Sequence, residues 1–230
     1  MEKFNVNKTK QGIMVITILS IILMFIVDYF IQPGYLIKSM FKIILFLTIP
    51  LIFVKVGRSI SIKDYFKISS KKQLLISLGL GIGVYIIILG AYFILKSFIN
   101  LDNIQDILLE RLNVDKDNFI FVALYISFFN SLLEEFFFRG FIFLSLLKTS
   151  GRYKAYIISA FAFAIYHVAI MVGWFNIALF LVALSGLFIG ALIFNYLNEK
   201  NNNIYNSWLV HMFANFAINT VGFIMFGIIG

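Results

Sequence analysis

Cysteine is absent from this chain of 230 residues, proline and histidine each occur only twice, and only 13% of the residues are charged. Without cysteine the protein can form no disulfide, no cysteine-ligated zinc site and no thiol nucleophile. A soluble domain carries roughly a quarter of its residues as charged side chains. The low charge and the 61% share of hydrophobic residues therefore exclude an ordinary soluble fold.

Long apolar runs dominate the sequence, each about 20 residues in length, which is enough to cross the hydrocarbon core of a bilayer. Backbone groups in lipid are satisfied only in helices or closed barrels, and these runs lack the alternation of barrel strands. We therefore predict an all-α, polytopic membrane helical bundle of about seven transmembrane helices, in a single membrane domain 1–230 with catalytic helices in 118–228. The predicted spans are residues 12–31, 36–55, 73–95, 118–147, 154–172, 174–197 and 204–228.

The basic residues predict the orientation of the bundle. The net charge of +8 is attributed to cytoplasmic loops and not to a nucleic-acid partner. With the N-terminus in the cytoplasm, 13 lysines and arginines fall in cytoplasmic segments and 5 in outer segments, with Lys38 and Lys42 counted among the outer ones. We therefore expect a multi-pass protein of the cell membrane, embedded in the lipid bilayer, with a cytoplasmic N-terminus and an outer C-terminus.

Three segments between or before the spans need an interpretation. The first apolar run follows three lysines, but no small-residue cleavage site comes after it, so we expect an uncleaved helix. The basic segment 56–72 is expected to lie on the anionic cytoplasmic leaflet. The acidic outer segment 97–117 fits either a short amphipathic helix or a solvated loop. In a helix, one side would carry Ile104, Ile107, Leu108 and Leu112.

Two glutamates and an arginine lie inside the fourth predicted span, where ionisable groups are costly and usually functional. Glu135 and Arg139 are four residues apart, which favours an ion pair on one helix face. Glu134 points about 100° away around the helix and has no partner at that spacing. We therefore predict a supporting role for Glu135 and Arg139 and a general-base role for an unpaired Glu134. The alternative is a salt-bridge cluster that only fixes helix packing.

Both histidines of the chain also lie inside predicted spans. Phe163 precedes His167 by one turn, and His211 and Asn215 share one helix face. Each motif alone is typical of helix packing. Counted along the helices from the nearest cytoplasmic lysine, however, Glu134, His167 and His211 lie at depths of roughly 21, 20 and 16 Å. We therefore expect one common site in the middle of the membrane.

The residue types at this site favour hydrolysis by water. Glu134 and His167 can take a proton from water, and His211 and Asn215 can donate hydrogen bonds to a tetrahedral oxyanion. Alternatively, Glu134, His167 and His211 can hold zinc with one open position, although no His-Glu-x-x-His sequence is present. An aspartyl dyad is not expected, because Asp28 and Asp64 lie in or beside loops near other spans. The choice between water alone and a metal stays open at this point.

Three ordered motifs resemble those of the CAAX protease and bacteriocin-processing (CPBP) family, also called Abi proteins. They are Glu-Glu-x-x-x-Arg at 134–139, Phe-x-x-x-His at 163–167 and His-x-x-x-Asn at 211–215. A small-residue helix around 184–190 is also similar to that family, and the likeness covers residues 130–219. The resemblance implies an intramembrane endopeptidase in which Glu134 and His167 activate water, His211 and Asn215 form the oxyanion hole, and Glu135 and Arg139 support the site.

The family is classed with metalloproteases, so the resemblance leaves zinc as an alternative cofactor. Its eukaryotic and archaeal members trim prenylated CAAX proteins, and bacterial members are linked to bacteriocin maturation, self-immunity and processing of membrane proteins. The composition, rich in Lys, Asn, Ile and Phe, suggests an AT-rich bacterium, so we expect a membrane-associated peptide or protein, lipoprotein-like and not prenylated, as substrate. The rival functions are a non-proteolytic scaffold or bacteriocin immunity protein on the same fold, and a transporter, which would show internal repeats.

Overall fold

The computed structural model describes residues 6–57, 62–67 and 70–229. Within these residues seven helical segments are long and apolar enough to cross a membrane, and no strand is present. The seven spans are Val6–Ile31, Tyr35–Gly57, Lys71–Phe98, Phe119–Ser150, Arg152–Met171, Ile177–Asn201 and Tyr205–Met225. They coincide with the seven predicted spans, which confirms the all-α, polytopic architecture. Lys3 and Arg58 and parts of segment 56–72, which entered the predictions of orientation and leaflet contact, lie outside the described residues.

Several spans are built from more than one helical element. Within several spans the α-helix changes to a short π-helical stretch. These stretches and two 3-10 turns carry the label η. The elements in chain order are α1 (Val6–Ile26), η1 (Val27–Ile31), α2 (Tyr35–Ile43), η2 (Ile44–Thr48), α3 (Ile49–Gly57), the 3-10 turn η3 (Lys63–Phe66), α4 (Lys71–Leu95), the 3-10 turn η4 (Lys96–Phe98), α5 (Leu101–Leu112), α6 (Phe119–Tyr125), η5 (Ile126–Asn130), α7 (Ser131–Glu134), η6 (Glu135–Leu144), α8 (Ser145–Ser150), α9 (Arg152–Tyr166), α10 (Val168–Met171), α11 (Ile177–Asn201) and α12 (Tyr205–Met225).

Polar caps set the ends of the helices that begin or end outside the apolar runs. Asn100 and Asn176 accept hydrogen bonds from the backbone N–H groups three residues later and so start α5 and α11. Asn113 and Asn202 adopt the left-handed conformation that ends the same two helices. The turn between the first two spans contains Pro33 and a left-handed Gly34, which suits a tight reversal.

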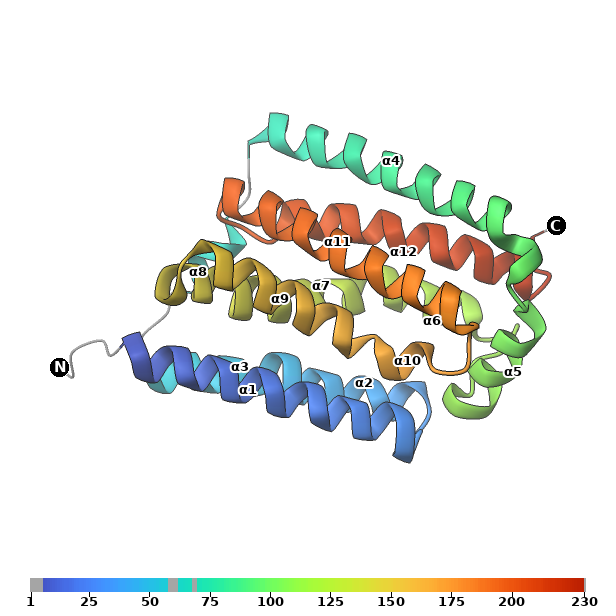
Figure 1. Cartoon of the computed structure of the whole chain (residues 1–230), viewed down its shortest axis with the longest axis horizontal. Coiled ribbons are helices and arrows are strands. Elements are labelled where there is room, and N and C mark those ends of the chain that lie inside the picture. Colours follow the sequence, from blue (N-terminus) through green and yellow to red (C-terminus); the bar gives the residue numbers. More distant parts are fainter. Residues whose placement is uncertain (1–5, 58–61, 68–69, 230) are drawn as a thin grey trace.

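The helices lie side by side in layers, with their long axes roughly aligned (Figure 1). α4 forms one outer layer and packs on α12, while α11 packs on both α9 and α12. The first two spans form the opposite outer layer, where α1 contacts α3, α8 and α9. The second half of the fourth span lies in the interior, where every residue of η6 is buried.

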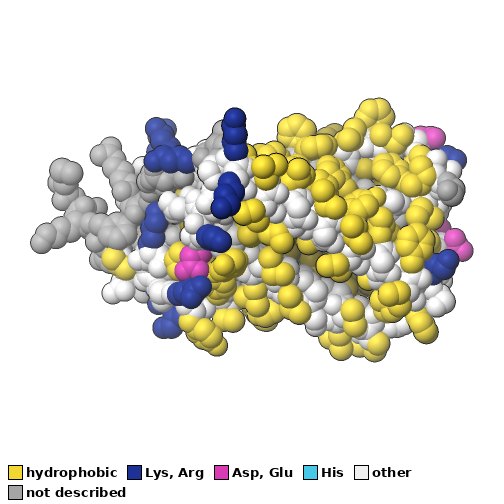
Figure 2. Space-filling model, turned by 90° about the horizontal axis from the view of Figure 1, so that it is seen from above, with side chains coloured by type: hydrophobic (Ala, Val, Ile, Leu, Met, Phe, Trp, Pro, Cys, Tyr) yellow, Lys and Arg dark blue, Asp and Glu magenta, His cyan; other side chains and the backbone are white. Residues whose placement is uncertain are grey.

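The interior and the outer surface of the bundle carry different kinds of apolar side chain. Phenylalanines of η6 interlock with aromatic rings of neighbouring spans: Phe137 stacks on Phe46 with centroids 4.2 Å apart, and Phe138 meets Phe163 edge to face at 5.2 Å. Such pairs stabilise the core beyond the burial of area alone. The outer helices instead expose isoleucine, leucine and phenylalanine around the middle of the molecule, where lipid is the solvent (Figure 2).

The acidic segment between the third and fourth spans is a helix and not a solvated loop. α5 buries Ile104, and its Leu108 and Leu112 pack on a small cluster that contains Phe119 and Phe226. Of the two interpretations of this segment, the amphipathic helix is therefore confirmed. α5 lies at the end of the bundle opposite the N-terminus (Figure 1).

The α4–α12 contact gives a testable consequence of close packing. At Gly81 of α4 a Cβ would approach the Phe213 ring to 2.6 Å, whereas at Gly83 no atom lies within 4 Å. We expect Gly81→Ala to lower the free energy of unfolding by about 1–3 kcal/mol through overpacking. Gly83→Ala is expected to raise it by about 0.5–1 kcal/mol, because alanine is the better helix former. Unfolding by SDS titration measures both, and equal effects of the two substitutions would refute the packing argument.

Candidate active site

His167 lies at a break in the fifth span, between the end of α9 and the start of α10. Its Nδ1 is 2.8 Å from the backbone oxygen of Phe163, one turn earlier. Because a carbonyl oxygen only accepts hydrogen bonds, Nδ1 carries the proton and the Nε2 of the neutral ring keeps its lone pair. The Phe163 ring packs on the imidazole with centroids 4.5 Å apart. Phe163 therefore fixes His167 through both its backbone and its side chain.

Glu135 orients the second histidine, His211 of α12. The Nδ1 of His211 is 2.9 Å from Glu135 Oε1, and Ser207, one turn earlier on α12, donates to Glu135 Oε2. Arg139 Nη1 lies 3.1 Å from Glu135 Oε1, which confirms the ion pair predicted from the spacing. As at His167, the carboxylate acceptor places the proton on Nδ1 and leaves Nε2 free.

Arg139 is enclosed by aromatic rings. Its side chain is 0% exposed, and its Cζ lies 4.1 Å from the ring centroid of Phe163 and 4.9 Å from that of Phe194. A guanidinium over ring faces is stabilised by the ring quadrupole, most strongly where water is excluded. Glu135 also contacts His211 and Ser207, so the ion pair connects α12 to the central span. The two opposite charges of the pair balance each other inside the bundle.

Glu134 has two hydrogen-bond partners on one of its oxygens, so the prediction that it is unpaired is wrong. Oε1 accepts from Lys42 Nζ at 2.9 Å and from Asn130 Nδ2 at 3.0 Å. Lys42 belongs to α2, 92 residues away in the sequence, where i to i+4 spacing cannot reveal it. Placing Lys38 and Lys42 in an outer segment is wrong as well, because both are buried inside the second span.

The second oxygen of Glu134 faces both histidines. Oε2 is 3.9 Å from His167 Nε2 and 3.8 Å from His211 Nε2. These separations are too long for direct hydrogen bonds but suit a single water that bridges the groups. The structure thus brings Glu134, His167 and His211 from three spans around one point, as the similar depths in the sequence predicted.

Asn215 lies one turn after His211 on α12 but uses its amide differently. Its Nδ2 donates to the backbone oxygen of Ile126 in η5 at 3.2 Å. One amide N–H is therefore bound to the neighbouring span, and the other N–H is the one left for a ligand. No contact between Asn215 and the Glu134 carboxylate is among the hydrogen bonds of the described residues, so the oxyanion role of Asn215 stays a prediction.

A third buried ion pair lies near the site, and sequence analysis missed it. Lys38 Nζ of α2 is 2.8 Å from Asp28 Oδ1 of η1. Asp28 was predicted to lie in or beside a loop and is instead buried in the first span. Next to this pair a cavity of about 20 Å³ is bounded by Arg111 of α5 and by Trp174. Arg111 also donates to the backbone oxygen of Val172, which ties α5 to the turn after α10.

The donor set does not fit a bound zinc ion as the side chains lie. The Nε2 atoms and Oε2 converge, but the described residues contain no group of three histidine or carboxylate side chains arranged to hold a metal. In addition, the ammonium of Lys42 already lies 2.9 Å from the only carboxylate of the candidate set. A divalent cation on Glu134 would have to share that carboxylate with a buried positive charge, which is electrostatically unfavourable.

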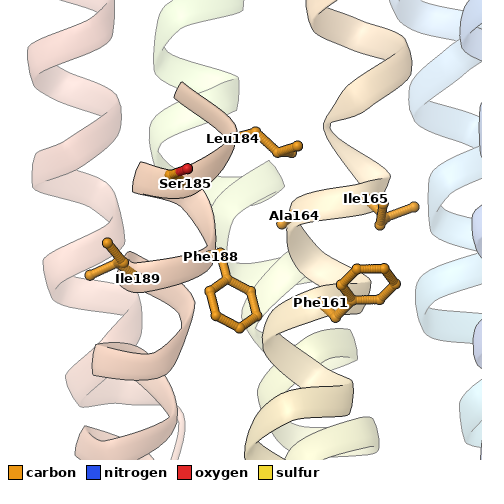
Figure 3. Close-up of a pocket in the computed structure, with 7 residues that line it drawn as sticks. All are labelled: Phe161, Ala164, Ile165, Leu184, Ser185, Phe188 and Ile189. Carbon is orange, nitrogen blue, oxygen red and sulfur yellow. The ribbon is translucent and has the colours of Figure 1, made fainter. Parts of the chain in front are cut away.

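A larger hollow lies on the outside of α9 and is distinct from this site. The groove of about 390 Å³ runs between α9 and α11 and is lined mainly by apolar side chains (Figure 3). Leu184 and Phe188 of α11 reach toward Ala164 and Phe161 of α9. None of the predicted site residues lines it, so this groove and the polar cluster are separate features.

The fold and the cluster together define a multi-pass membrane protein with a glutamate and two histidines facing one another inside the bundle. Residues 116–217 match the family model described as type II CAAX prenyl endopeptidase Rce1-like. This segment, somewhat less than half of the chain, is thus similar to the Rce1-like family of CAAX-type endopeptidases, in agreement with the resemblance of the three motifs. All seven predicted site residues lie within the matched segment, whereas Lys42 lies outside it. Neither the comparison with curated proteins nor that with solved structures gave a match.

Proposed function

We propose that this protein hydrolyses a peptide bond of a membrane-associated peptide or protein, using a water molecule activated by Glu134. One observation carries the proposal: Glu134 Oε2 and the Nε2 atoms of both histidines face one another at 3.8 and 3.9 Å. A water held between them has acceptors for both of its protons. A carboxylate and an imidazole nitrogen with a free lone pair are both groups that can act as general bases.

The reaction would proceed in two proton transfers. Glu134 takes a proton from water as the oxygen attacks the peptide carbonyl carbon, and the proton then passes to the leaving amine as the C–N bond breaks. His167, with a free Nε2, shares the proton during attack. Between the two transfers the same proton can pass from Glu134 to Nε2 of His211, because the buried Glu135 beside Nδ1 stabilises the resulting imidazolium; this imidazolium donates a hydrogen bond to the oxyanion and then gives the proton to the leaving amine. The second N–H of Asn215 is the further donor proposed for the oxyanion.

The proposed substrate is lipoprotein-like, and the proposed orientation is N-terminus in the cytoplasm. On the face drawn in Figure 2, lysine and arginine side chains gather toward the end where the chain begins. Removing the buried Lys38 and Lys42 from the outer segments leaves three basic residues there, so the charge asymmetry behind this orientation becomes larger.

His167→Ala tests the proposed reaction directly. In proteoliposomes containing a library of N-palmitoylated peptides, with products identified by mass spectrometry, we expect turnover by this variant to fall by about 10²–10⁴-fold. Tyr153→Ala is the matched control, because Tyr153 is an exposed aromatic residue at the other end of the same helix. Absence of cleavage by the wild type, or equal turnover by wild type and His167→Ala, would contradict the proposal.

Treatment with a chelator tests the conclusion that the side chains at the site do not fit a bound zinc ion. Because Lys42 neutralises Glu134 and no three-ligand group is present among the described residues, we propose that catalysis needs no bound metal. Prolonged treatment with 1,10-phenanthroline should leave wild-type turnover within about twofold of the untreated protein, since the reaction uses no metal that the chelator could remove. Loss of turnover that is restored by added Zn²⁺ would reverse this conclusion and assign Glu134, His167 and His211 as ligands.

A further inference from the structure

The two oxygens of Glu134 have separate environments. Oε1 receives both hydrogen bonds, from Lys42 at 2.9 Å and from Asn130 at 3.0 Å. Oε2 has neither of these donors and is the oxygen that faces the histidines. The carboxylate can swing about its last side-chain bond, so its orientation depends on what holds Oε1. The two donors on Oε1 therefore fix the carboxylate so that Oε2 faces His167 and His211.

Lys42 is itself held firmly. It is 4% exposed, and its Nζ donates to Asn130 Oδ1 at 2.6 Å as well as to Glu134. The ammonium also lies 4.8 Å from the ring centroid of Tyr166 and 5.8 Å from that of Phe46. An ammonium among aromatic rings and without water is stable only with an anionic partner. Because Tyr166 directly precedes His167, Lys42 bridges the helices that carry the base and the first histidine.

We infer that Lys42 of α2 is a positioning residue for the peptidase reaction, which keeps Glu134 ionised and its Oε2 aimed at the histidines. The inference rests on the proposed function, and it extends the site beyond the matched segment 116–217. The second span therefore completes the active site and is more than a lipid-facing scaffold. Asn130 serves the same purpose from the same span as Glu134, one turn earlier.

Kinetics of Lys42→Met in proteoliposomes test this role. The side chain donates to Oε1 of Glu134, while Oε2 is the oxygen that faces the histidines, so its loss should act on kcat and leave KM nearly unchanged. A displacement of a catalytic group by about 1 Å costs about 10²-fold in rate, which is the expected fall in kcat. Lys42→Arg keeps the charge and should recover at least about tenfold of that loss, because a guanidinium also donates to a carboxylate.

Lys38→Met is the matched control. Lys38 lies one turn earlier on α2, is equally buried, and is paired with Asp28 at 2.8 Å instead of with Glu134. Its removal deletes the same charge from the same helix, so a general weakening of the fold would affect both variants. We expect kcat of Lys38→Met to stay within about threefold of wild type, since its partner has no contact with the reacting groups.

Melting temperature in detergent supplies a readout that does not depend on activity. Lys42→Met alone leaves Glu134 buried without its counter-charge and should lower the melting temperature, whereas Lys42→Met with Glu134→Gln should recover most of that loss. Equal losses of kcat in Lys42→Met and Lys38→Met, wild-type kcat in Lys42→Met, or additive melting shifts would overturn the inference while the wild type still cleaves peptide. A wild type that cleaves no peptide, with the melting shifts still coupled, would instead show that the proposed function has failed and the role of Lys42 with it.

Discussion

Glu134→Gln is expected to reduce peptide turnover by about 10³-fold, in the range that general-base catalysis contributes. Glutamine has nearly the same shape as glutamate, and its side-chain oxygen can still accept from Lys42 and Asn130. Its amide group cannot take a proton from water, however, so the substitution removes the base and leaves the outline of the site. The same proteoliposome assay with N-palmitoylated peptides measures the effect on kcat.

The matched control for this substitution is Glu199→Gln. Glu199 is also ion-paired, with Arg152 at 2.9 Å, but it lies near the end of α11 and has no contact with either histidine. Its neutralisation should leave kcat close to the wild-type value. Glu134→Asp adds a second test, because it keeps the carboxylate but shortens its reach by one methylene. We expect an intermediate rate, about 10²-fold below wild type, from misplacement alone.

Loss of the counter-charge needs to be separated from loss of the base. Glu134→Gln leaves the Lys42 ammonium buried with neutral acceptors only, which will weaken the fold as well as the chemistry. A melting curve in detergent shows which fraction of the variant is folded under assay conditions, and turnover is expressed per folded molecule. If folded Glu134→Gln cleaves peptide within tenfold of the wild-type rate, Glu134 is not the base.

The length of apolar runs and the spacing of residues along a helix predicted the features that depend on residues close together in the sequence. A bilayer requires a continuous apolar run, so the seven spans follow from the sequence with errors only at their ends. The first helix already includes Val6 and the polar residues that follow it, before the predicted start at residue 12, because a helix can continue beyond the apolar run that crosses the bilayer. The Glu135–Arg139 pair follows from helix spacing, and similar depths placed Glu134, His167 and His211 together.

Contacts between helices could not be predicted in the same way. Lys42 and Glu134 are 92 residues apart, and only the packing of α2 against the fourth span brings them together. A signal was nevertheless present, because Lys38, Lys42 and Asp28 all fall inside predicted spans, where an ionisable residue calls for a partner. Ser207 and Asn130, each one turn before a site residue, carried a similar local signal.

The exact winding of the central span was also beyond reach. η5 and η6 are π-helical on either side of α7, and such stretches often occur at functional sites. Nothing in residue spacing distinguishes them from ordinary α-helix. Asn215 shows the same limit for side chains, since its amide donates to the backbone of Ile126, a partner that only the packed bundle supplies.

Arg139→Met is expected to destabilise the protein more than any other single substitution considered, by about 3–5 kcal/mol. Both Glu135 and Arg139 are fully buried, so removing the guanidinium leaves a carboxylate charge inside the bundle that His211 and Ser207 alone must balance. The methionine also forfeits the contact of the guanidinium with the Phe163 and Phe194 rings. SDS titration of the wild type and the variant measures the free energy of unfolding.

The double variant Glu135→Gln/Arg139→Met separates charge from packing. With both charges removed, the cost of the uncompensated carboxylate disappears, and we expect more than half of the lost free energy of unfolding to return. The control is Arg152→Met, an exposed arginine paired with Glu199, where screening by water makes the pair contribute little. The double variant should still be inactive, because an amide in place of Glu135 cannot balance the imidazolium of His211 during the reaction. A double variant as unstable as Arg139→Met would show that the packing of Arg139 on the Phe163 ring of α9 and the Phe194 ring of α11, and not its charge, makes the larger contribution to stability.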